Sequence, residues 1–329
     1  MKCFVWRWAA VVVVLVCSVT RVSAGPAVWP AHLPVYDHVV IVVEENKNYE
    51  QVIDPKAAPY IYGTLRAEGA NLTQMFGEEH YSEGNYFWLI AGGNMNIGFG
   101  DAIPSKENNP AYPFLAPNLG AQLIMKGLSF KGYSEDLPAV GDTVGRKNHY
   151  ARKHVPWVSF GNIPNGTNVS DSSNLRLVDF PTDFARLPTV SFVIPNLIHD
   201  MHDGKSADSI PAGDMWLKKH LDAYYQWAKT HNSLLVITFD EDSNASGYTG
   251  VTDPASADKG IRNNIPTLFA GAHIKHGDYA EGRGTTHVNI LRTLEAMYKL
   301  EKCGAQQPNA LKAGIADDAL LTDIFEKVP

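Results

Sequence analysis

The segment HVVIVVEEN, from His38 to Asn46, decides the fold of this chain. It is a continuous run of β-branched residues bounded by polar ones, a pattern typical of a strand that is buried on both faces. The segments TVSFVIPN (189–196) and SLLVITFDEDSN (233–244) repeat the pattern, and IPTLFAGAHI (265–274) is a weaker fourth example. We therefore expect a central sheet whose strands are mostly buried.

Helical periodicity appears between these strands. Residues 213–232 place Leu217 and Leu221 on one face behind an Asp214 cap, and residues 287–300 repeat the spacing. Buried strands that alternate with amphipathic helices predict an α/β fold, a three-layer sandwich with a mainly parallel central sheet.

Outside these elements, two regions define the organisation of the chain. Residues 1–24 have a cationic start, the short apolar core AAVVVVLVCSV and small residues up to Ala24, as in a secretory signal peptide. The apolar core is shorter than the roughly 20 residues that a membrane span needs. Residues 94–179 are rich in Gly, Pro and Asn and predict long loops over the sheet edge. We expect a signal peptide at 1–24, a single domain at 25–329, and a secreted or periplasmic location.

Charge and cysteine content exclude several classes of protein. The 329 residues are 45% hydrophobic and 19% charged, which is ordinary globular composition. Loss of the signal peptide removes three cationic residues and no acidic one, so the formal charge moves from −7 to −10. Such a chain should not bind nucleic acid through bulk electrostatics. Only Cys303 would remain, which rules out a disulfide framework. We expect no integral membrane association and no protein partner.

Polar side chains gather where the predicted strands end. The ends and the start of the late helix carry Glu45 and Asn46, Asp200 and His202, Asp240 and Glu241, and His287. Open α/β sheets bind ligands beyond the carboxyl ends of their strands. One carboxylate at a strand end is ordinary turn chemistry, but several together repel each other unless protons or metal ions compensate them. The pattern predicts a metal site at this edge.

The stretch HYSEGNYFWLIAGG, residues 80–93, contains Ser82 at the start of an apolar run and Asn85 three positions later. Two interpretations are open. Serine commonly caps a helix by accepting from backbone N–H groups, which needs no chemistry. Alternatively, Ser82 is a nucleophile that attacks a phosphorus held near those same backbone donors. The stretch alone favours the cap, because motifs of this length occur often by chance.

The order of these motifs resembles the alkaline phosphatase superfamily, and more narrowly its phosphoesterase family of acid phosphatases and phospholipases C. The matching segments are HVVIVVEENKNYEQVI, HYSEGNYFWLIAG, GLSFKGYSEDLP, YARKHVPWV, FVIPNLIHDMHDG, LLVITFDEDSN and THVNILRTLE. They span most of the chain after the predicted signal peptide. The chain is most similar to short secreted bacterial acid phosphatases, including those of the phosphatidylinositol 3-phosphate phosphatase type.

The resemblance implies a role for each candidate residue. Ser82 would be the nucleophile, and Asn85 would donate to a phosphoryl oxygen. Lys153 and His154 would stabilise phosphate charge or protonate the leaving alcohol, and the alternative for them is a solvated basic loop. Glu45, Asn46, Asp240 and Glu241 would hold a first metal; Asp200, His202 and His287 would hold a second metal or act as an acid/base pair. The ion would be Ca, Mg, Mn, Fe or Zn, with one or two per chain.

Two departures from the family pattern bear on these roles. Relatives usually have prolines at the positions of Tyr81 and Gly84, and we expect Gly84 to loosen the first helical turn, because glycine destabilises a helix interior by about 0.5–1 kcal/mol. The acidic pair Asp240-Glu241 replaces the usual Asp-His pair, which favours harder, oxygen-preferring metals.

Together these observations predict a secreted, metal-dependent phosphoric monoester hydrolase that acts through a phosphoserine intermediate. Its substrate would be a small-molecule or lipid-headgroup phosphate ester. A phospholipase C that cleaves lipid phosphodiesters remains open, as does an inactive secreted binding protein on the same fold.

Overall fold

The computed structural model describes residues 32–98, 100–243, 263–280 and 284–327. The signal peptide predicted at residues 1–24 lies outside these ranges. Within them, the helices are all too short or too polar to span a bilayer.

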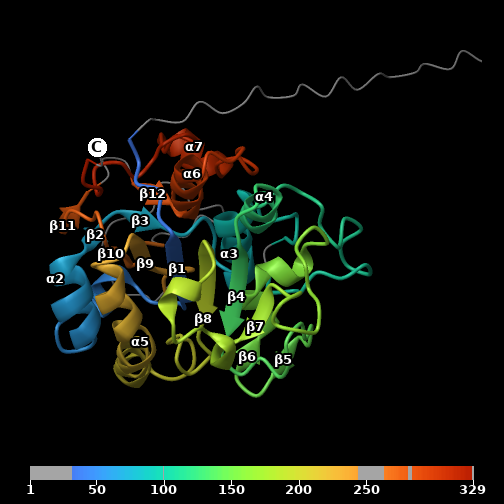
Figure 1. Cartoon of the computed structure of the whole chain (residues 1–329), viewed down its shortest axis with the longest axis horizontal. Helices are drawn as coiled ribbons and strands as arrows, with labels where there is room; N and C mark the ends of the chain where they lie inside the picture. The colour runs from blue at the N-terminus through green and yellow to red at the C-terminus, as the bar shows by residue number, and fades with distance from the viewer. Residues whose placement is uncertain (1–31, 99, 244–262, 281–283, 328–329) are drawn as a thin grey trace, which may run out of the picture.

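The core of the protein is an eight-stranded sheet (Figure 1). Across the sheet the order is β11 (Gly277–Tyr279), β2 (Ala70–Leu72), β10 (Thr267–Gly271), β9 (Ser233–Phe239), β1 (His38–Glu44), β8 (Val190–Ile194), β4 (Phe130–Ser134) and β7 (Asn174–Arg176). Five of the seven neighbouring pairs are parallel, and β10 runs antiparallel to both of its neighbours. The prediction of a mainly parallel sheet is confirmed.

Strand β1 lies between β9 and β8, in the middle of the sheet. Val39 pairs with Leu234 on one side and with Val190 on the other. Residues 39–44 are fully buried, as expected for a β-branched run with neighbours on both faces. Glu44 is in register with Phe239, so the segments that follow β1 and β9 leave the sheet side by side. This pairing brings two of the predicted acidic strand ends together.

Three longer helices cover the sheet: α3 (Ser82–Ala91), α5 (Ser206–Ala228) and α6 (His287–Met297). Helix α5 packs against β9 and β10, and α6 packs against α3. Figure 1 shows α5 and α6 at opposite sides of the molecule. The shorter helices are α1 (Tyr49–Val52), α2 (Arg66–Glu68), α4 (Leu119–Met125) and α7 (Pro308–Ala313).

Two expectations about local structure were wrong. Helix α5 begins at Ser206, so Asp214 lies inside it and its carboxylate accepts the backbone N–H groups of Tyr60 and Ile61. The segment 94–179 also contains α4 and two strands of the central sheet, β4 and β7. The sequence of β4, FKGYS, lacks the continuous apolar run that identifies the other strands. Its glycine, Gly132, is needed because Trp157 packs against it, and a Cβ there would lie 2.0 Å from the indole ring.

Candidate active site

The hydroxyl of Ser82 points away from its own helix. Ser82 is the first residue of α3, and no side chain caps this helix. Its Oγ donates to Glu45 Oε2 at 2.9 Å, and Lys153 Nζ lies 3.4 Å from the same Oγ. The serine is 1% exposed. The interpretation of Ser82 as a helix cap is therefore wrong, and the hydroxyl lies between a carboxylate and an ammonium group.

The residue before Ser82 has an unusual backbone conformation. Tyr81 has φ 100° and ψ 108°, a region that L-residues seldom occupy and that costs on the order of 1–3 kcal/mol. Its N–H donates to Glu241 Oε2 at 2.7 Å. This bond anchors the turn that carries the nucleophile to the acidic segment after β9.

Gly84 is required by packing. A Cβ at this position would lie 1.6 Å from Glu79 Oε1. The Glu79 carboxylate in turn accepts from Trp88 Nε1 and Asn94 Nδ2, and every residue of α3 is buried. The absent side chain makes room for a carboxylate that ties the helix to its surroundings, which acts against the loosening expected from glycine at this position.

Glu45 connects Ser82 to His154. Its Oε1 accepts from Tyr86 Oη at 2.6 Å and lies 3.2 Å from His154 Nε2. The His154 ring stacks on Tyr86, with centroids 5.1 Å apart, and its Nδ1 is 3.5 Å from Asp200 Oδ2. Burial lowers the pKa of His154, and nearby cations act in the same direction. A neutral imidazole thus lies between two buried carboxyl groups.

Asn46, Asp240 and Glu241 form the other half of the cluster. The Asn46 backbone N–H donates to Asp240 Oδ1 at 3.0 Å, and its side-chain Nδ2 donates to Glu241 Oε1 at 3.2 Å. Asn46 has φ 47°, a left-handed conformation that asparagine tolerates better than most residues. The parallel pairing of β1 with β9 thus brings together two strand ends that are 194 positions apart in the sequence.

These carboxyl groups are poorly compensated. Burial raises the pKa of Glu45, and Asp240 and Asp200 raise it further, while Lys153 opposes them. Burial and Asp240 raise the pKa of Glu241 to about 9. The pKa values of Asp200 and Asp240 are also raised, mainly by burial. The site as described therefore binds protons more strongly than ordinary carboxylates do, and it would gain from an added cation.

The donor atoms fit a hard cation in their chemistry. Asn46 Oδ1 and Asp240 Oδ2 are buried and have no hydrogen-bond partner. Amide and carboxylate oxygens are the ligands that Mg²⁺, Mn²⁺ and Ca²⁺ prefer. In the described part of the chain, no three His, Cys, Asp or Glu side chains are already arranged around one point for an ion. Binding would therefore require small shifts of these side chains.

Two candidates, Asn85 and His287, bond to groups outside this arrangement, whereas a third, His202, is tied to it by its backbone N–H, which donates to Asp200 Oδ1 at 2.8 Å. Asn85 Oδ1 accepts the backbone N–H groups of Glu78 and Glu79, and its Nδ2 donates to the Glu79 carbonyl. His287 contacts Glu78 Oε2 through Nδ1 and the Phe239 carbonyl through Nε2, which leaves neither ring nitrogen for an ion. His202 Nδ1 contacts Asp203 at 2.9 Å. In this structure Asn85 and His287 hold the 78–79 segment in place.

The electrostatics of His287 agree with this structural role. Burial acts to lower its pKa, but the Glu78 carboxylate raises it overall. A protonated ring could donate to both of its partners, the carboxylate and the carbonyl.

A pocket of about 400 Å³ is connected to Ser82 through Lys153, whose Nζ lies 3.4 Å from Ser82 Oγ. It is lined by Asp101, Ile103, Gly145, Arg146, Ala151, Lys153, Leu197 and His202. Sequence reasoning missed Asp101, whose Oδ2 lies 2.7 Å from Lys153 Nζ and whose Oδ1 accepts the Glu83 N–H. It lies in a loop without periodicity, so no sequence signal could have identified it.

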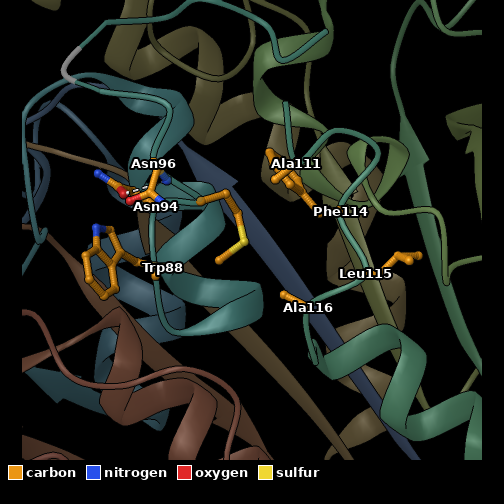
Figure 2. Close-up of a pocket in the computed structure, with 9 residues that line it drawn as sticks. Trp88, Asn94, Asn96, Ala111, Phe114, Leu115 and Ala116 are labelled. Atoms are coloured by element: carbon orange, nitrogen blue, oxygen red, sulfur yellow. Dashed lines mark hydrogen bonds between the residues drawn. The ribbon is translucent and has the colours of Figure 1, made fainter. Parts of the chain in front are cut away.

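A second pocket, of about 450 Å³, lies near the end of α3 (Figure 2). Its lining includes Trp88 and Asn94 on one side and Phe114, Leu115 and Ala116 on the other. None of the clustered polar residues around Ser82 lines it, so its walls are separate from the candidate active site.

Comparison with a solved structure places the fold in a known class. A protein in the alkaline phosphatase superfamily from Vibrio parahaemolyticus matches with a TM-score of 0.56 and 14% identity, over 91% of this chain and 75% of that one. The fold is that of the alkaline phosphatase superfamily.

Sequence comparison narrows this class. The model of the Phosphoesterase family matches residues 53–301. A phosphatidylinositol-3-phosphatase of Mycobacterium tuberculosis is 45% identical over 304 residues, 91% of each chain. A probable acid phosphatase of Kluyveromyces lactis is 24% identical over 289 residues, 82% of this chain and 60% of that one. The chain belongs to the Phosphoesterase family, as its motifs predicted, and is a phosphoric ester hydrolase.

Proposed function

We propose that this protein is a secreted, metal-dependent phosphomonoesterase in which Ser82 forms a phosphoserine intermediate. The observation that carries the proposal is the position of the Ser82 hydroxyl, buried between Glu45 and Lys153 at the carboxyl edge of the sheet. A structural serine at a helix start would be expected to bond to its own backbone. This one instead has an acceptor for its proton and a cation beside its oxygen.

In the first step, the side chains around Ser82 each have a separate role. The Ser82 oxygen forms a bond to phosphorus as its proton passes to Glu45 Oε2, and the bond from phosphorus to the alcohol oxygen breaks. Glu45 Oε2 already accepts the hydrogen bond of this hydroxyl, which places it to take up the proton. Lys153 is placed to attract the phosphoryl oxygens. The departing alcohol takes a proton from His202, the histidine of the pocket lining.

The second step returns the enzyme to its starting state. Water attacks the phosphoserine and returns a proton to His202, phosphate leaves, and the Ser82 oxygen regains its proton from Glu45. His154 contacts Glu45 Oε1 on the side away from Ser82, so we assign it to positioning this carboxylate.

A single divalent ion completes the proposed site. We assign the ion to Asn46 and Asp240, whose Oδ1 and Oδ2 are buried acceptors without a hydrogen-bond partner, together with Glu241, which is hydrogen-bonded to Asn46; Glu45 is reserved for the Ser82 proton. When bound, the ion supplies positive charge for the phosphoryl group and lowers the pKa of the attacking hydroxyl. The arrangement of His287 gives no support for the second ion that its sequence position suggested.

Substrate charge favours a monoester over the lipid diester of a phospholipase C. A monoester dianion carries two charges, which an ion and Lys153 can offset. The −10 formal charge expected after signal cleavage should repel an anionic membrane over a Debye length of about 8 Å. We expect a higher kcat/KM for p-nitrophenyl phosphate than for its choline diester. A higher value for the diester, with release of diacylglycerol from vesicles, would favour the phospholipase.

The Ser82→Ala variant tests the nucleophile. We expect it to lose turnover of p-nitrophenyl phosphate while keeping its melting temperature within a few degrees, because no cap is removed. Mass spectrometry of acid-quenched wild-type enzyme should find phosphate on Ser82. A variant that retains turnover, or a label on another residue, would overturn the mechanism, and an inactive wild type would favour the binding-protein alternative.

A further inference from the structure

Two cationic side chains, Lys153 and Arg146, line the pocket of about 400 Å³ described above. Lys153 reaches the nucleophile, whereas Arg146 is exposed to solvent. The same lining includes the apolar residues Ile103, Ala151 and Leu197. With a volume of about 400 Å³, the pocket is larger than one phosphoryl group needs and is within the usual range for small-molecule sites.

Arg146 has a charge that its surroundings leave uncompensated. Lys153 is paired with Asp101 at 2.7 Å, and His202 contacts Asp203 at 2.9 Å. Among the described residues, no carboxylate lies within ion-pair distance of Arg146. The pKa of His154 is lowered first by burial and then by cations that include Arg146, so the guanidinium is close enough to act on the buried cluster.

The backbone fixes where this guanidinium lies. Arg146 belongs to β5 (Arg146–Lys147), which pairs with β6 (Tyr150–Ala151), and its direct partner in register is Ala151. Neighbouring side chains of a strand point to opposite faces. Arg146 lines the pocket and Lys147 does not, although both are exposed.

We propose that this pocket binds the alcohol part of the ester, and that Arg146 selects alcohols with an apolar body and a second anionic group. The proposal rests on the proposed function, since it names the substrate class of that same site. A guanidinium recognises carboxylate or phosphate oxygens through two parallel hydrogen bonds, which gives geometric selectivity as well as attraction. The second anion can belong to a soluble bisphosphate or to the phosphodiester of a phosphorylated lipid headgroup.

Two esters of matched shape isolate the second charge. We would measure kcat/KM for 3-carboxyphenyl phosphate and for its neutral isostere, 3-carbamoylphenyl phosphate. We expect the wild type to favour the carboxylate about tenfold, the usual value of one charge-assisted hydrogen-bonded contact. In Arg146→Ala this ratio should fall close to one, and Arg146→Lys should keep part of it. Lys147→Ala is the matched control and should keep the full ratio.

The outcomes separate this inference from the proposed function. Equal kcat/KM values for the two esters in the wild type, or a preference that survives in Arg146→Ala, would overturn the selection by Arg146 and leave the phosphomonoesterase standing. If the wild type hydrolyses neither ester, both the selection by Arg146 and the proposed phosphomonoesterase activity are overturned.

The source of the second anion is then found by comparing two substrates. An inositol bisphosphate and vesicles of phosphatidylcholine with 5% phosphatidylinositol monophosphate are compared as substrates of wild type, Arg146→Ala and Lys147→Ala. Loss of activity in Arg146→Ala on either substrate supports the proposal and identifies its source. Equal rates of all three proteins on both substrates would contradict it.

Discussion

Ser82, at the start of α3, is bonded through its hydroxyl to Glu45, the residue that follows the central strand β1. The position of the nucleophile is therefore set by the middle of the sheet as well as by its own helix. Lys153 approaches the same oxygen from a third segment, after β6.

The first prediction concerns Lys153. Burial acts to lower its pKa, but Glu45 and Asp101 raise it overall, so the side chain stays cationic at neutral pH. Lys153→Met should lower kcat/KM for p-nitrophenyl phosphate by about 10²-fold, as expected for the loss of one group that stabilises phosphoryl charge. Asp101→Asn keeps the cation and should have a smaller effect. A wild-type rate in Lys153→Met would assign this lysine to structure alone.

The second prediction concerns Glu83, a buried carboxyl beside the nucleophile. Burial and Asp101 raise its pKa to about 8, above the ordinary value of 4.5. The free energy of unfolding should therefore fall as the pH rises from about 4.5 to 8, because the unfolded chain releases this proton before the folded protein does. Each unit of pKa shift corresponds to roughly 1.4 kcal/mol. Glu83→Gln should melt at a higher temperature than the wild type at pH 8 and at the same temperature at pH 4. A pH-independent difference would show that Glu83 is not titrating.

The third prediction concerns α3. Gly84→Ala should reduce the free energy of unfolding by about 1–3 kcal/mol, because the new methyl group collides with Glu79. Gly63→Ala is the control, since a Cβ there has no heavy atom within 4 Å. In a Glu79→Ala background the added cost of Gly84→Ala should largely disappear. Denaturant unfolding of the four proteins measures this coupling, and additive effects would mean that the two side chains do not conflict.

The fourth prediction concerns the ion. At pH 7 the Glu241 carboxyl of ion-free protein should be protonated, because its pKa is about 9, so ion binding should release close to one proton. Calorimetric titration in buffers of different ionisation enthalpy measures this release. Chelation should also abolish turnover and lower the melting temperature. Full activity in protein shown by elemental analysis to be metal-free would rule out the proposed ion.

The sequence predicts β1, β8 and β9 well and β4 poorly, for a physical reason. Strand β1 is buried on both faces and needs only apolar residues, so its run of β-branched residues identifies it as a buried strand. Strand β4 is defined by a tertiary contact, the indole of Trp157 over Gly132, and no local pattern records it. Strands 189–196 and 233–244 were found because their composition alone is sufficient.

The same distinction applies to the site. Strand ends can be located from the sequence, which identified the residues around Ser82 that the structure brings together. The sequence does not show whether a side chain at a strand end already has hydrogen-bond partners within the protein. His287 was predicted as a metal ligand because it begins a helix near this edge, but Glu78 and a carbonyl occupy its ring nitrogens.

The contact between Glu79 and Gly84 also limits how this sequence can diverge. Any residue other than glycine at position 84, proline included, brings a Cβ into the space of the Glu79 carboxylate. A lineage that acquires proline at 84 must therefore redirect or replace the Glu79 side chain, and with it give up the bonds to Trp88 and Asn94. Substitutions at the two positions should therefore be coupled in evolution.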